Sequence, residues 1–155
     1  MKKPALILLI VLLFTSAKAQ TPDSFLGKWA GSGTLYNTAA TFSMEWERVL
    51  NEQFYRLTFT NALDNGAFSM NAHGYYKMKG DSITGQWFDT RGVSFPVTGV
   101  VKDQTMIIHW GTADFEQGKT EYALFASGKM EVIDFVLRNG EYAQFGKATY
   151  QRKQD

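Results

Sequence analysis

The sequence predicts an all-β protein that folds as a single ten-stranded antiparallel up-and-down (meander) β-barrel. Short runs rich in Phe, Tyr, Trp, Val, Ile and Thr alternate with turn signals about every 10 to 15 residues. No stretch keeps a helical period of apolar residues for more than two turns. Because the connections are short, each strand runs antiparallel to the previous one, and closing the sheet removes both exposed edges. A two-sheet sandwich of the same strands is the alternative.

Turn signals divide the chain into these strands, and one longer connection spans residues 112–118. Asn65-Gly66 and Asn139-Gly140 are typical of type I′ hairpins. The second of these keeps the strand faces in phase only if a β-bulge follows. The turn signals are Asn37-Thr38, Asn51-Glu52, Asp64-Asn65-Gly66, Lys79-Gly80-Asp81, Thr90-Arg91-Gly92, Lys102-Asp103, Ser127-Gly128 and Asn139-Gly140.

The first residues have the layout of a secretory signal peptide. A basic start is followed by an apolar run over residues 5–14 and by the small-x-small ending Ala17-Lys18-Ala19. The apolar run is too short for a comfortable membrane span, although a retained N-terminal anchor is the alternative. We expect a signal peptide at residues 1–19, a barrel domain at residues 20–155, and no stable membrane insertion after cleavage. The protein is then periplasmic or secreted.

Composition excludes several classes of function. Of 16 basic residues, three lie within residues 1–19, so the formal charge changes from +1 to −2 on cleavage. This balance lacks the basic excess of a nucleic-acid-binding protein. With no cysteine and two histidines, neither disulfides nor a structural zinc site are expected, and we predict no metal ligands.

The turn positions predict which residues face each other across neighbouring strands. A two-residue turn at Asn37-Thr38 places Trp29 opposite Trp46, and later turns place Trp110 opposite Phe95. In this register all four tryptophans share one face, and the opposite face is polar. Because a slip of one residue swaps the faces, this separation supports a barrel with an aromatic interior.

The inward face carries the predicted ligand-binding residues. They combine aromatic rings and adaptable methionines with a few polar groups, as small-molecule sites do. They are Met44, Trp46, Met70, Trp87, Asp89, Phe95, Met106, Trp110, Thr120, Tyr122 and Asp134.

The inward polar residues gather toward one end of the barrel. Asp89, Thr120 and Asp134 lie toward the connections near residues 37, 65, 91, 115 and 139, whereas Trp29 and Arg152 lie toward the opposite end. We expect an acidic mouth in which Asp89 and Asp134 orient the polar end of a ligand, with pKa values raised by desolvation. Alternatively, Arg91, Thr120 or backbone amides cap both carboxylates, which then only order the mouth.

Four glycines, Gly31, Gly33, Gly74 and Gly85, also point inward, beside large rings. Small residues opposite large ones let a barrel bend and its interior fill. Either the glycines shape a cavity or they only allow curvature; the sequence leaves both open.

The first strand resembles that of a known superfamily. Gly27-Lys28-Trp29 is similar to the G-x-W of the calycins, which include lipocalins and fatty-acid-binding proteins, and "GKWAGSGTLY" resembles the opening of nitrobindin-type haem barrels. The resemblance implies a calycin-like barrel, with Arg152 of the last strand against Trp29. Nitrobindins bind haem through a histidine near the C-terminal end of the barrel, and this chain has none beyond His109.

Both histidines are predicted to lie on the outer wall. The register places His73 opposite Phe88 and His109 opposite Glu121, so we interpret both as wall residues that hydrogen-bond across strands. A haem ligand and an acid–base catalyst paired with Glu121 are the alternatives. We expect no cofactor, with haem as the minor option, and assign no catalytic residue.

The resulting functional hypothesis is an exported β-barrel that holds a small, largely apolar molecule in its lumen. The alternatives are a partner-binding or inhibitor-like envelope module with a filled barrel, and a small isomerase, cyclase or hydrolase. The chain has no P-loop, dinucleotide fingerprint or nucleophile-elbow serine, which favours a binding protein over an enzyme.

Overall fold

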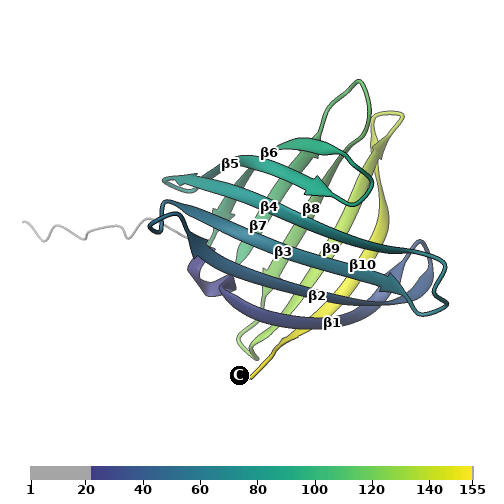
Figure 1. The fold of residues 1–155 in the computed structure, drawn as a ribbon, viewed down its shortest axis with the longest axis horizontal. Coiled ribbons are helices and arrows are strands. Elements are labelled where there is room, and N and C mark those ends of the chain that lie inside the picture. The colour runs from purple at the N-terminus through teal and green to yellow at the C-terminus, as the bar shows by residue number, and fades with distance from the viewer. Residues whose placement is uncertain (1–21, 155) are drawn as a thin grey trace, which may run out of the picture.

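The computed structural model describes residues 22–154, and the predicted signal peptide at residues 1–19 lies outside the described residues. Ten strands form one closed antiparallel barrel in which each strand pairs with its sequence neighbours and β1 pairs with β10 (Figure 1). The predicted all-β fold, a single closed ten-stranded meander barrel, is confirmed. The elements are the 3-10 helix η1 (Pro22–Phe25) and the strands β1 (Gly27–Leu35), β2 (Thr38–Val49), β3 (Phe54–Leu63), β4 (Ser69–Lys79), β5 (Ser82–Asp89), β6 (Ser94–Lys102), β7 (Thr105–Gly111), β8 (Gln117–Leu124), β9 (Lys129–Arg138) and β10 (Glu141–Arg152).

The core occupies the inside of the barrel, as the alternating pattern predicts. Trp29 and Trp46 are buried, and Trp87 and Trp110 pack against the core while keeping some exposure. Glu47 and Arg56 face each other on the outer wall and form an ion pair. Among residues 22–154, no helix has the length and apolar character needed to cross a bilayer.

The first hairpin shows how turn chemistry sets the register. The turn is made by Tyr36 and Asn37, with φ angles of 50° and 61°, not by Asn37-Thr38. Positive φ is unfavourable for a β-branched residue such as Thr38 but accessible to Asn. As a consequence Trp29 lies opposite Met44, and the predicted pairing of Trp29 with Trp46 is wrong by two residues.

A second shift occurs between β6 and β7. The turn begins at Asp103, which takes a φ of 54°, so Trp110 lies opposite Val97 instead of Phe95. A third shift lies between β7 and β8, where the connection covers residues 112–116 and His109 lies opposite Lys119 instead of Glu121. All three shifts are of two residues, which leaves the inner and outer faces as predicted.

The last hairpin contains the bulge that a two-residue turn needs to keep the strand faces in phase. Asn139 and Gly140 have φ angles of 53° and 83°, as a type I′ turn requires. The register between β9 and β10 then shifts between Gln144 and Gly146, which brings Gly146 opposite Asp134. The extra residue in β10 restores the alternation, so Asp134 faces the lumen.

The end of the barrel near the N-terminus is closed by η1. Phe25 is fully buried there, and its ring packs edge-on against Tyr122. The Trp29 indole N–H donates to the Phe25 carbonyl, and the Arg152 guanidinium stacks 4.2 Å above the Trp29 ring. Arg152 also donates to the carbonyls of Leu26 and Ser24. The expected Arg152–Trp29 contact is confirmed, whereas η1 itself was not predicted.

Candidate functional site

A cavity of about 90 Å³ lies within the half of the barrel toward the Tyr36-Asn37 and Asn139-Gly140 turns. Aromatic and aliphatic side chains from many strands make most of its wall, and a few polar groups interrupt it, as in small-molecule sites. The lining residues are Met44, Phe59, Asn61, Met70, Tyr76, Trp87, Arg91, Phe95, Val97, Ile108, Trp110, Thr120, Tyr122, Val132, Asp134 and Phe145.

Most residues expected around the lumen border this cavity. Eight of them do so: Met44, Met70, Trp87, Phe95, Trp110, Thr120, Tyr122 and Asp134. Trp46 and Met106 are buried in the core without lining the cavity, and Asp89 is turned toward Arg91. Two residues along a strand span about 6–7 Å, so side chains on the same face belong to different layers of the interior.

Eight further lining residues were not predicted. Phe59, Asn61, Tyr76, Val97, Ile108 and Val132 share the inward face of their strands, so alternation alone would have found them. Phe145 lines the cavity at the β10 bulge, and Arg91 reaches it from the turn between β5 and β6. Neither position follows from alternation within a regular strand.

The inward glycines do not line the cavity. A Cβ at Gly31 would come within 2.6 Å of the Tyr150 ring, and one at Gly74 would overlap the Tyr76 hydroxyl. These two glycines therefore make room for core aromatic rings.

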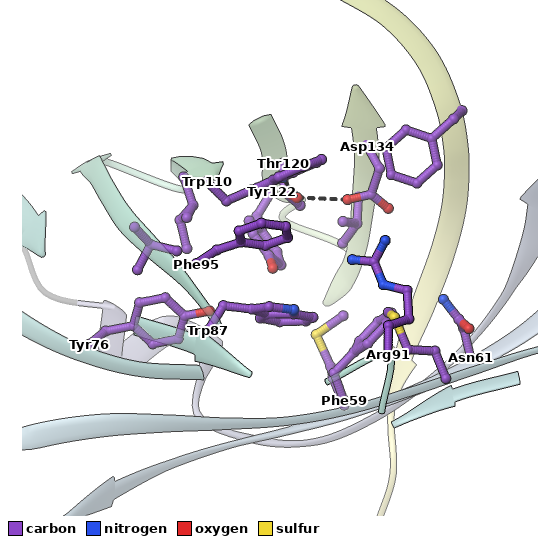
Figure 2. A pocket seen from close by; sticks show the side chains of 16 residues that line it. Phe59, Asn61, Tyr76, Trp87, Arg91, Phe95, Trp110, Thr120, Tyr122 and Asp134 are labelled. Carbon is purple, nitrogen blue, oxygen red and sulfur yellow. Dashed lines mark hydrogen bonds between the residues drawn. The ribbon is translucent and has the colours of Figure 1, made fainter. Parts of the chain in front are cut away.

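Asp134 forms a short hydrogen-bonded chain inside the barrel. The Thr120 hydroxyl donates to the Asp134 carboxylate over 2.7 Å (Figure 2). The same hydroxyl accepts the Trp110 indole N–H over 3.3 Å. Burial raises the pKa of Asp134 to about 6, although the hydrogen bond from Thr120 acts in the opposite direction. The expected raised pKa is therefore found at this carboxyl.

Asp89 behaves differently because Arg91 covers it. Its carboxylate accepts hydrogen bonds from the Arg91 guanidinium, at 2.8 Å, and from the Trp87 indole N–H, at 3.0 Å. Desolvation raises its pKa, but these hydrogen bonds outweigh that effect, and the pKa of Asp89 lies below its usual value. The prediction of a raised pKa at Asp89 is wrong. Arg91 also bonds Glu116 at 3.1 Å, so two carboxylates flank one guanidinium.

Asn61 contributes a polar atom of another kind. Its residue is 7% exposed, and its side-chain oxygen is buried with no hydrogen-bond partner among residues 22–154. An unsatisfied buried acceptor costs about 1–3 kcal/mol. A bound molecule that donates a hydrogen bond to this oxygen would remove that cost.

Two exposed rings flank the cavity end of the barrel. Tyr36 is 56% exposed and stacks on Phe145, and Phe115 is 70% exposed and packs against Phe95. Both come from turns, and both contact a residue that lines the cavity.

The histidines lie on the outer wall, as predicted. His73 is exposed with its Nδ1 3.4 Å from the Thr58 hydroxyl, and His109 is exposed with its Nδ1 3.4 Å from the Tyr142 hydroxyl. Neither lines the cavity, and a space of about 90 Å³ does not admit a porphyrin. The described residues therefore do not fit a haem. In the range 22–154, no group of three or more His, Cys, Asp or Glu side chains is placed to hold a metal ion.

These features define a calycin-like β-barrel with a small internal cavity. The crystal structure of Rv2717c from M. tuberculosis matches the chain with a TM-score of 0.64. The match covers 84% of this chain and 94% of Rv2717c, at 13% sequence identity, and it establishes likeness of fold. No protein-family model and no curated protein sequence matches the chain.

Proposed function

We propose that this chain is an exported calycin-like barrel that binds a small, largely apolar molecule in its lumen. The observation that carries the proposal is the cavity, in which aromatic walls surround the half-buried Asp134 carboxyl and an amide oxygen of Asn61 that has no hydrogen-bond partner among residues 22–154. Its opposite end is closed by η1, so the space is a pocket with one accessible end. The signal-peptide pattern of residues 1–19 supports export.

The cavity volume limits the size of the occupant. A cavity of about 150 Å³ lined by apolar side chains binds benzene, and the space here is about 90 Å³. The proposed ligand is therefore compact, with far fewer atoms than a fatty acid or a haem.

Tryptophan fluorescence tests the proposal, because Trp87 and Trp110 line the cavity. We expect 2-bromopropane, a compact heavy-atom quencher, to quench part of the emission saturably, at about one molecule per chain. Val132→Phe places a ring in the cavity and should abolish the saturable part. Ile133→Phe, on the outer face of the same strand, is the matched control and should leave it unchanged. Quenching that is linear in concentration and equal in both variants would refute lumenal binding.

A partner-binding module is the second candidate, and the exposed rings of Phe115 and Tyr36 favour it. Native mass spectrometry of the protein purified from its own host separates the two functions. A small added mass supports lumenal binding, whereas a protein partner that is lost on Phe115→Ser substitution supports the second candidate.

A further inference from the structure

Asp134 and Asn61 border the cavity with oxygen atoms that can accept further hydrogen bonds. The Asp134 carboxylate receives one hydrogen bond, from Thr120, and the Thr120 hydroxyl in turn accepts the indole N–H of Trp110. Asn61 adds a buried oxygen that has no partner within residues 22–154. In Figure 2 the Asp134 carboxylate and the Asn61 side chain border the same pocket from different strands. A molecule that satisfies both groups has to donate hydrogen bonds or carry positive charge.

The cation at the cavity is already engaged. Among the lining residues, Arg91 alone carries a positive charge, and its guanidinium bonds Asp89 on one side and Glu116 on the other. Two carboxylates therefore bond this one guanidinium, and Asp134 adds a third carboxyl to the cavity wall, so the net charge of these four groups is negative when Asp134 is ionised. An anionic ligand would meet no free cation here, and it would be repelled by Asp134.

The walls are suited to a desolvated cation. Rings of Trp87, Phe95 and Trp110 border the cavity, and the Phe95 and Trp110 rings stack 6.0 Å apart. Tryptophan, tyrosine and phenylalanine rings attract ammonium groups through their negative faces, most strongly where water is excluded.

We infer that the ligand is a compact organic ammonium ion whose cationic group is bordered by Asp134 and Asn61. The rings of Trp87, Phe95 and Trp110, which border the same small cavity, then surround the ion and face its positive charge. This inference rests on the proposed function, since it names the chemical class of the molecule bound in the same cavity.

Two probes of equal shape test the inference separately from the proposed function. The purified protein is titrated at about pH 8 with tert-butylammonium chloride and with tert-butyl alcohol, by calorimetry and tryptophan fluorescence. We expect the ammonium ion to bind about tenfold or more tightly than the alcohol, since a desolvated cation–π contact and a charge-assisted hydrogen bond both favour it. Equal or tighter binding of the alcohol would overturn the inference while leaving lumenal binding in place. Binding of neither probe, together with linear quenching by 2-bromopropane, would overturn both.

Variants identify the carboxylate responsible. Asp134→Asn should reduce the affinity for tert-butylammonium about tenfold or more and leave that for tert-butyl alcohol within about twofold. Glu131→Gln, on the outer face of the same strand, is the matched control and should change neither affinity. If Asp134→Asn and Glu131→Gln give the same ammonium affinity, Asp134 does not hold the cation and the inference fails.

The pH dependence provides a third measurement. The titratable groups that face Asp134 are Tyr122 of β8, Tyr150 of β10 and Tyr36 of the first turn, and burial raises the pKa of all three phenols, which stay neutral. Since burial raises the pKa of Asp134 to about 6, the carboxylate is lost below that pH, whereas the ammonium probe stays charged. The preference for the ammonium ion should therefore shrink between about pH 8 and pH 5. An equal preference at both values would contradict the assignment of Asp134.

Discussion

Replacing Asp134 with asparagine tests how much folding stability is lost when a charged carboxylate is buried in the lumen. Burial raises the pKa of this carboxyl from 3.8 to about 6. Between these values the native protein keeps a proton that the unfolded chain has released, so stability falls as the pH rises. One pKa unit corresponds to about 1.4 kcal/mol, so the full loss above pH 6 is roughly 3 kcal/mol. The asparagine side chain has the same shape, can accept the Thr120 hydrogen bond and has no charge to bury.

We therefore expect Asp134→Asn to be more stable than the unmodified protein by up to about 3 kcal/mol above pH 7, with the difference shrinking toward pH 4. Urea unfolding followed by tryptophan fluorescence measures it. With slopes of about 1–3 kcal/mol per molar urea, the midpoint should rise by about 1 M or more at the higher pH. Glu131→Gln controls for the loss of a carboxylate on the outer wall, where Glu131 pairs with Lys147. A stability difference for Asp134→Asn that is the same at pH 4 and pH 8 would refute the reasoning.

Two further predictions concern the framework of the barrel. A Cβ at Gly33 would overlap the backbone carbonyl oxygen of Lys147. Gly33→Ala should therefore lower the free energy of unfolding by about 1–3 kcal/mol. The control Ser32→Ala, on the outer face of the same strand, should lower it by less than about 0.5 kcal/mol. Arg152→Ala removes the cation above Trp29 and two hydrogen bonds to the carbonyls of Leu26 and Ser24. Hydrogen exchange of the backbone amides of residues 22–29 should therefore accelerate at least tenfold. Unchanged exchange would show that Arg152 does not hold η1 in place.

The assignment of residues to the inside or outside follows from the sequence because side chains alternate strictly along a strand. All four tryptophans were predicted to face inward, and the structure places them so. For the same reason, a register error of two residues leaves the predicted inner face unchanged. Trp29 lies opposite Met44 instead of the predicted Trp46, and both of these side chains face inward. Turn chemistry decides those two residues, and it depends on which side chain accepts a positive φ.

The two acidic residues predicted at the mouth have pKa shifts whose directions the sequence alone does not determine. Both Asp89 and Asp134 were expected to have a raised pKa, but Arg91 lowers that of Asp89, and only Asp134 keeps the predicted direction. Arg91 is two positions from Asp89 in the chain, yet its second partner, Glu116, comes from a distant turn. The direction of a pKa shift depends on such neighbours, and alternation along strands does not specify them.

By itself the sequence determined the barrel and its aromatic interior, because both depend on local periodicity and on turn residues. The contact of Arg152 with Trp29 was implied by the resemblance of the first strand to the calycins. Only the tertiary structure decided the closure of one end by Phe25, the size of the cavity and the lack of a partner for the Asn61 oxygen within the described part of the chain. These features arise where side chains from strands far apart in the chain meet. The space left between them depends on the twist and register of the whole closed sheet.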